Sequence, residues 1–186
     1  LRRARVRAEI LGDARPLLTL SLQDMTTFHF KRSFGAILAP FGALTLLADA
    51  PARARCLARC RAHLAIDAPI WVDIAAIRPG GPTERIFHTT FCMLGNGRLV
   101  EKHTVQRRSD DGAAVEIEYR YRLMDPAGDA TLDSFDVAFR LALLEEDELI
   151  EELHAAGFVI QGLFGDWRGG PSGAGGARCI VEALAH

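Results

Sequence analysis

Apolar and polar residues are arranged along the chain in blocks that predict an α/β fold. Three short, nearly continuous apolar runs predict buried strands: 17–22, 34–41 and 69–77. A stretch rich in Ala, Arg and Leu at 51–64 predicts a helix between the second and third of them. This order is typical of a parallel sheet that is covered by helices. Residues 1–11 predict a further helix, which ends in the segment Asp13 to Pro16.

In the middle of the chain the hydrophobic period changes to two. Four runs predict strands: 86–94, 98–108, 114–124 and 133–143. Turn sequences centred on Asn96 and on Asp111 join the first three runs. Five alternate residues of the third run are apolar and define one face: Val115, Ile117, Tyr119, Tyr121 and Leu123. We therefore predict an antiparallel meander with one buried and one exposed face, inserted into the α/β fold.

The last third of the chain returns to helix and strand. Residues 145–156 predict a helix with acids in its first turn, where they complement the helix dipole, and with Gly157 as its C-terminal cap. Residues 158–164 and 179–184 predict two strands, and the loop 165–176 between them is rich in glycine.

Composition narrows the functional classes. The chain has 186 residues and a formal net charge of −2, which favours one domain and gives no polyanion-binding surface. The arginines of residues 2–7 and 53–61 are interpreted as solvated helix faces. No apolar run approaches the roughly 20 residues that cross a bilayer. The four cysteines lack zinc-finger spacing and are expected to be free thiols. We expect a cytoplasmic protein with no nucleic-acid, membrane or metal partner.

The tail of the chain carries the most specific signal, in the order acidic helix, Ala156-Gly157-Phe158, short strand, Gly165-Asp166 and a glycine-rich loop. This order resembles the end of class I S-adenosylmethionine-dependent methyltransferases of the small-molecule type. The front agrees, because three segments are similar to that family's third strand with its acidic loop, its fourth strand, and its turn and fifth strand: 20–25, 34–37 and 64–73. The resemblance is greatest to members with an antiparallel insert after the fifth strand, including amino-sugar and glycine N-methyltransferases.

The resemblance implies a Rossmann-like methyltransferase sheet of strand order 3-2-1-4-5-7-6, here partial, because the first two strands and the glycine-rich cofactor loop are not in the sequence. We predict one domain over 1–186, with a partial core at 1–82 and 143–186 and the insert at 83–142. We expect the natural protein to extend before Leu1, and these residues alone to be a poor folding unit. Gly35 and Ala65 to Pro69 also depart from the family pattern, which has an acid and a Pro-Gly-Gly turn there.

The implied activity is transfer of a methyl group from S-adenosyl-L-methionine to a small-molecule amine or hydroxyl. In the family the loop acid accepts the adenine amino group, which suits a carboxylate. The implied cofactor-binding residues are Gln23, Asp24, Met25, Ala39, Pro40 and Phe41. The implied catalytic residues lie in the insert, where a histidine or tyrosine can act as base: His88, Tyr119 and Arg140. A homodimer is a candidate assembly.

Each of these residues also has a structural interpretation. Asp24 can be a loop acid or a helix cap, and Phe41 can pack in the core. Asp73, inside the third predicted strand, either orients a substrate or is a buried acid that the backbone satisfies. Trp167 is either a lid or part of the packing on the last strands. The alternative function for the whole chain is a non-catalytic, methyltransferase-like binding or dimerisation module.

Overall fold

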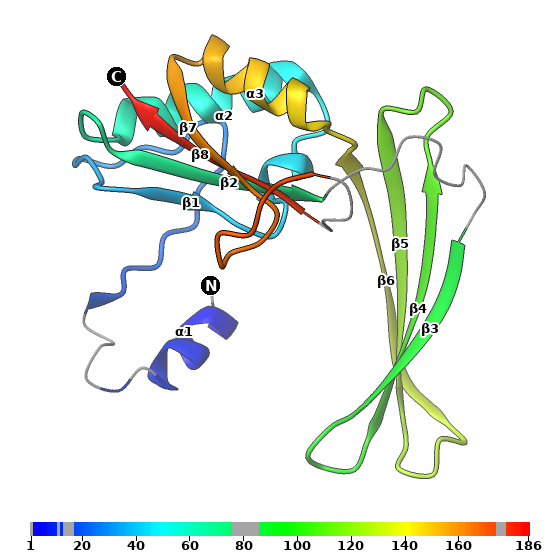
Figure 1. The fold of residues 1–186 in the computed structure, drawn as a ribbon. Helices are drawn as coiled ribbons and strands as arrows, with labels where there is room; N and C mark the ends of the chain where they lie inside the picture. The colour runs from blue at the N-terminus through cyan, green and yellow to red at the C-terminus, as the bar shows by residue number, and fades with distance from the viewer. Residues whose placement is uncertain (1, 11, 13–16, 76–85, 174–177) are drawn as a thin grey trace.

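The chain folds into two four-stranded sheets that lie side by side (Figure 1). The computed structural model describes residues 2–10, 12, 17–75, 86–173 and 178–186. The first sheet has the order β1-β2-β8-β7 and is built from both ends of the chain. Its strands are β1 (Ile37–Ala39), β2 (Pro69–Ala75), β7 (Phe158–Phe164) and β8 (Arg178–Ala185). The second sheet has the order β3-β4-β5-β6 and forms the predicted insert.

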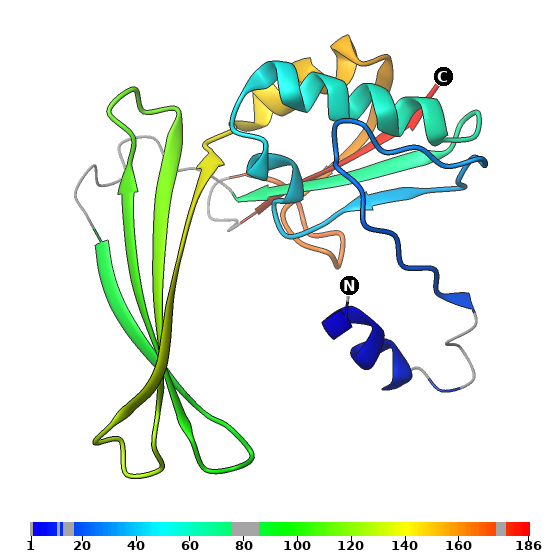
Figure 2. The same cartoon turned by 180° about the vertical axis from the view of Figure 1, so that it is seen from behind.

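The first sheet confirms the predicted partial Rossmann-like arrangement. β1 and β2 are parallel, and β8 pairs antiparallel with both β2 and β7. The crossover between the parallel strands is helix α2 (Ala50–His63), and α3 (Glu146–Ala155) leads into β7. Both helices cover the same face of the sheet (Figure 2). The order corresponds to strands 4-5-7-6 of the family pattern.

Local signals explain where the two helices begin. The side chain of Asp49 accepts a hydrogen bond from the Ala52 amide, and proline stands in the first turn of α2. Glu145 and Glu148 form a reciprocal capping box at the start of α3. Gly157 follows α3 with a φ of +84°, the left-handed conformation that a C-terminal cap needs. The helices at 51–64 and 145–156 were therefore predicted correctly to within a residue or two.

The core lies between the sheet and the two helices. Alternate residues of β2 point into it, namely Ile70, Val72 and Ile74, each 1% exposed. Leu57 of α2 and Leu149 of α3 are among the buried residues that meet them. Burial of such side chains contributes roughly 1.5–3 kcal/mol each and fixes the register of the strands.

The insert forms the predicted meander. Its strands are β3 (Ile86–Met93), β4 (Leu99–Arg108), β5 (Ala114–Met124) and β6 (Thr131–Ala142). Ion pairs such as Arg120–Asp136 line the polar face. The predicted face is buried only in part: Ile117 is 6% exposed, but Tyr119 and Tyr121 are half-buried and Phe135 is 58% exposed. The sheet meets the core at one end of β6, so most of its length projects away from the core (Figure 1).

Two predicted strands differ from the structure. Residues 17–22 form no strand, and Leu17 and Leu22 are 88% and 81% exposed. A strand needs a neighbour for its backbone hydrogen bonds, and no described strand lies beside this segment. The strand at 34–41 shortens to three residues, preceded by a single bridge from Phe34 to Leu64. The predicted helix 1–11 is α1 (Arg2–Ala8). Predictions for 13–16, 76–85 and 174–177 fall outside the described residues. None of the described helices is long and apolar enough to span a membrane.

Candidate functional site

The carboxyl end of β1 presents a strained aromatic residue. Ala39 ends the strand, Pro40 follows, and Phe41 adopts a φ of +60° with 84% of its surface exposed. A left-handed conformation is unusual for a bulky residue and marks a position that its surroundings hold in place. Ligands of open α/β sheets bind beyond the carboxyl ends of the strands. Phe41 therefore stands where a ligand is expected, which disfavours core packing.

Asp73 of β2 fixes the turn that follows Phe41. Its side chain is fully buried. Oδ1 accepts the Gly42 amide at 2.7 Å, and Oδ2 accepts Nη1 of Arg178 at 2.5 Å. The Arg178 guanidinium lies 5.9 Å from the centre of the Phe41 ring. The sequence identified Asp73 as a candidate, but it gave no signal for either partner.

Hydrogen bonds from Thr26 shape the predicted acidic loop around Asp24. Oδ1 of Asp24 accepts both the amide and the hydroxyl of Thr26, at 2.8 and 2.5 Å. These two bonds lower the pKa of the Asp24 carboxyl below its ordinary value, so it is ionised at neutral pH. Both bonds end on Oδ1, and Oδ2 remains able to accept a further donor. Gln23 accepts the His29 amide instead, and Met25 packs against the core.

Two side chains of helix α2 hydrogen-bond the backbone of the segment that follows the Asp24 loop. Nε of Arg59 donates to the Phe28 carbonyl at 2.9 Å. His63 accepts the Phe30 amide at Nε2 and contacts the Arg59 carbonyl at Nδ1, so Nδ1 carries the proton. His63 is 4% exposed and stands at the end of α2. Sequence reasoning missed Arg59 and His63, because their partners lie about 30 residues away.

The insert does not bring its three candidate catalytic residues together. His88 and Tyr119 lie in one cross-strand row on either side of Thr104. Arg140 lies on the opposite face, because strand alternation separates it from Val137, the cross-strand partner of Tyr119. Arg140 forms an ion pair with Asp111 at 3.2 Å. Nζ of Lys102 lies 3.6 Å from the centre of the Tyr119 ring.

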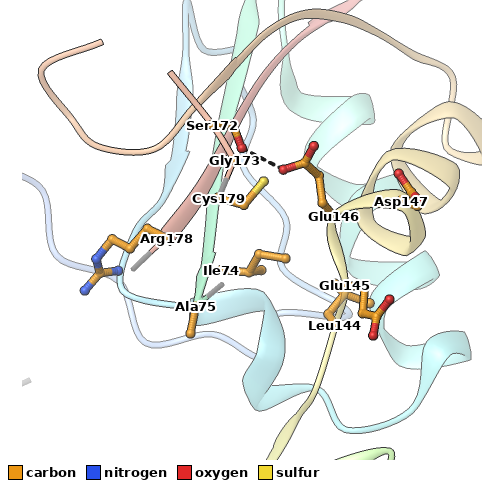
Figure 3. A pocket seen from close by; sticks show the side chains of 10 residues that line it. All are labelled: Ile74, Ala75, Leu144, Glu145, Glu146, Asp147, Ser172, Gly173, Arg178 and Cys179. Atoms are coloured by element: carbon orange, nitrogen blue, oxygen red, sulfur yellow. Dashed lines mark hydrogen bonds between the residues drawn. The ribbon is translucent and has the colours of Figure 1, made fainter. Parts of the chain in front are cut away.

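A cavity of about 310 Å³ opens beside the carboxyl end of β2 (Figure 3). Three acids at the start of α3 line one side, Glu145, Glu146 and Asp147, and Arg178 extends on the other. The Ser172 hydroxyl donates to Glu146 at 2.7 Å. Cys179 is buried in the wall, and burial, with the nearby Glu146, raises the pKa of its thiol to about 12. The negative lining favours a cationic or hydrogen-bond-donating group.

A second hollow lies on the sheet face opposite the two helices. Its aromatic wall stacks Trp71 on Phe164, with ring centres 5.7 Å apart, and Trp167 lies 6.3 Å from Trp71. Asp166 accepts the amides of Arg168 and Gly170 and so shapes the loop that carries Trp167. The contact between Trp167 and Trp71 supports the interpretation that Trp167 packs on the sheet rather than acting as a lid.

Comparisons with known proteins agree with this geometry at the level of the fold. The sequence matches no family model and no curated protein. The structure is similar to the CcbJ methyltransferase from Streptomyces caelestis, with a TM-score of 0.80 and 15% identity, over 100% of this chain and 70% of that one. It is also similar to DesVI from Streptomyces venezuelae (TM-score 0.71, 22% identity, 96% and 71% covered).

A third similar structure is CalS10, an amino pentose methyltransferase from Micromonospora echinaspora (TM-score 0.64, 20% identity), which covers 88% of this chain and 63% of that one. The chain thus spans between about 60% and 70% of these proteins. The two sheets, their strand orders and the insert confirm the predicted fold. The chain therefore has the Rossmann-like fold of class I S-adenosylmethionine-dependent methyltransferases over the part of that fold that it contains.

Proposed function

We propose that the protein binds S-adenosyl-L-methionine and transfers its methyl group to a small-molecule amine or hydroxyl. The observation that carries this proposal is the Asp24 loop, which presents an ionised carboxylate with Oδ2 still able to accept a donor. Asp24 accepts the adenine amino group, and the adjacent Met25 amide donates to a ring nitrogen. This donor and acceptor pair fits the edge of adenine, and the cofactor supplies the electrophilic methyl group.

The other predicted cofactor-binding residues have separate parts in the proposal. Gln23 shapes the loop through its bond to the His29 amide. Ala39 and Pro40 end β1 at the edge of the sheet formed by the carboxyl ends of its parallel strands. Phe41 follows them there and forms an apolar wall that excludes water from the methyl-transfer site.

The cavity beside β2 supports a small-molecule acceptor. Its volume of about 310 Å³ lies at the lower end of the range for ligand pockets. The acids Glu145, Glu146 and Asp147 favour an amine among the two acceptor classes. Similar structures include enzymes described as sugar and glycopeptide N-methyltransferases. His88 and Tyr119 lie on the insert outside the lining of this cavity, so either serves as the base for an acceptor that extends from the cavity to that face of the insert. Arg140 supports the insert through Asp111.

Calorimetry on the full-length protein tests the proposal. Wild-type protein is expected to bind S-adenosylmethionine, and Asp24→Ala to weaken binding at least ten-fold. The control is Asp110→Ala, which removes a fully exposed acid on a turn of the insert. Transfer of a labelled methyl group to small amines and alcohols then identifies the acceptor class. No binding by the wild type, or equal binding by Asp24→Ala, contradicts the proposal.

A second candidate function is a dimerisation module, favoured by the exposed aromatic face of the insert. Phe135 and Val137 of β6 are 58% and 40% exposed on the face that also carries Tyr121. We infer that a second copy packs on this face. Its aromatic rows carry little charge besides Lys102, so like-charge repulsion between two copies is small. Sedimentation of Phe135→Glu is expected to show monomers, whereas Phe91→Glu on the opposite face keeps dimers. Equal sedimentation of the wild type and the two variants excludes this interface.

We place the reaction in the cytoplasm. All four cysteines are free, three of them buried and Cys92 exposed. Free thiols persist in reducing compartments.

A further inference from the structure

Asp73 is a buried acid that the proposed chemistry does not use. It lies on the sheet face opposite the two helices, because its neighbours Val72 and Ile74 point into the core. Its carboxylate is fully buried, so both oxygens require partners. Those partners come from two distant segments: the Gly42 amide after β1 and the Arg178 side chain at the start of β8. Asp73 of β2 therefore links the end of β1 and the start of β8 at the edge of the sheet where β1 and β2 have their carboxyl ends.

The turn held by Asp73 is otherwise unfavourable. Phe41 and Gly42 are both left-handed, with φ of +60° and +68°. Glycine adopts this conformation freely, but phenylalanine does not. Besides the bond to Asp73, Gly42 is fixed through its carbonyl, which accepts the Thr45 amide at 3.0 Å and the Thr45 hydroxyl at 2.7 Å. The turn is thus held on both sides, and Phe41 is kept pointing out of the edge.

Sheet geometry explains why Arg178 can reach the same carboxylate. Arg178 pairs with Ala75, which lies two residues beyond Asp73 on the same face of β2. This is the diagonal relationship that long side chains bridge across antiparallel strands. With one Nη atom on Asp73, the Arg178 side chain remains 39% exposed, and its guanidinium carbon lies 5.9 Å from the centre of the Phe41 ring. The buried Asp73 carboxylate therefore sets the positions of both the Phe41–Gly42 turn and the Arg178 guanidinium.

We propose that Asp73 is a positioning residue, which holds the Phe41–Gly42 turn and Arg178 in the arrangement that forms one wall of the cofactor site. This inference rests on the proposed function. Asp73 contacts no ligand itself and acts through the Gly42 amide and the Arg178 guanidinium.

Two measurements on the full-length protein test the inference. The hydrogen-exchange rate of the Gly42 amide reports whether its bond to Asp73 is formed, and it can be measured without any ligand. We expect exchange at least ten-fold faster in Asp73→Ala than in the wild type. We expect Asp73→Asn to retain most of the protection, because the amide oxygen still accepts from Gly42. Calorimetry with S-adenosylmethionine is expected to show at least ten-fold weaker binding by Asp73→Ala. The control is Asp110→Ala, which removes a fully exposed acid on a turn of the insert.

The outcomes separate the two proposals. Unchanged exchange at Gly42 shows that Asp73 does not hold the turn and overturns the inference. Faster exchange with unchanged affinity shows that the turn is outside the cofactor site, which also overturns it. If the wild type binds no S-adenosylmethionine, the proposed function fails, and the positioning role falls with it, whatever the exchange rates show. If Asp73→Ala does not fold, Arg178→Gln replaces it: weaker binding by that variant supports the inference, and wild-type affinity overturns it.

Discussion

Arg53 of α2 and Glu152 of α3 form an ion pair that links the two helices. Nε of Arg53 lies 3.0 Å from both carboxylate oxygens, and Nη2 lies 2.7 Å from Oε1. Nη1 of Arg53 donates to the carbonyls of Leu47 and Ala48, before the start of α2. The side chains are 9% and 18% exposed. Because the pair is buried and well bonded, each partner depends on the other for compensation of its charge.

We expect Glu152→Ala to lower the free energy of unfolding by about 3–5 kcal/mol, since it leaves the Arg53 guanidinium buried without its carboxylate. The double variant Arg53→Met, Glu152→Leu is expected to lose less, because no charge remains. Urea unfolding measures both. The control is Asp136→Ala, which breaks the exposed pair with Arg120 and is expected to have a small effect. A loss after Glu152→Ala as small as that of the control contradicts this account.

Local patterns predicted the helices and most strands, whereas partners distant in sequence were not predictable. Gly157 directly follows α3, so the sequence indicated the end of that helix, and the predicted helix 51–64 lies within one residue of α2. The cap at Asp49 was not predicted. The apolar segment from Leu17 to Leu22 has the composition of a strand, but strand formation depends on a neighbour that composition does not reveal.

The candidate site shows the same division. The Asp24 loop is held by a short-range turn with Thr26, which a local motif can indicate. The bond between Asp73 and Arg178 joins residues 105 positions apart. The sequence could have predicted that Arg140 and Tyr119 lie on opposite faces. Phe139 belongs to the apolar face that carries Tyr119, and Arg140 is its neighbour along the strand, so Arg140 must face the other side.

Cofactor binding is expected to depend on pH through Asp24. Hydrogen bonds from Thr26 lower the pKa of Asp24, so the carboxylate that we propose binds adenine is present above that lowered value and is lost as the pH falls through it. Thr26→Val removes the largest cause of the shift and moves the loss of affinity to higher pH. Thr26→Ser keeps the hydroxyl and is expected to match the wild type. Calorimetry with S-adenosylmethionine from pH 7 downwards measures the three curves, and superimposable curves for Thr26→Val and the wild type argue against the role of Asp24.

The four cysteines are expected to differ sharply in reactivity. Burial raises the pKa of Cys179 to about 12, so only about one part in ten thousand is thiolate at pH 8. Cys60 donates a hydrogen bond to Cys56, which with burial raises the pKa of Cys60 and lowers the pKa of Cys56. Cys56 is only 5% exposed, so a reagent does not reach its thiol in the folded protein. Cys92 is the exposed thiol. A thiol reagent at pH 8 should therefore label one cysteine in the folded protein and four after denaturation. Cys92→Ser should abolish the fast reaction, and a second thiol that reacts equally fast in the folded protein would disprove the assignment.

Asp67 occupies the turn before β2, and it adopts a φ of +58°. Its amide donates to the Ala185 carbonyl at 2.8 Å, so the turn also aligns β2 with the end of β8. Aspartate tolerates the left-handed region better than a β-branched residue does. We expect Asp67→Val to lower the free energy of unfolding by about 1–2 kcal/mol and Asp67→Gly to leave it unchanged or slightly raised. Ile66→Val is the matched control, because that exposed neighbour lacks the left-handed conformation. Thermal unfolding of the three variants measures the order of their stabilities. An equal loss of stability in Asp67→Gly and Asp67→Val would show that the contacts of the aspartate side chain, including the pair with His186, matter more than the backbone conformation.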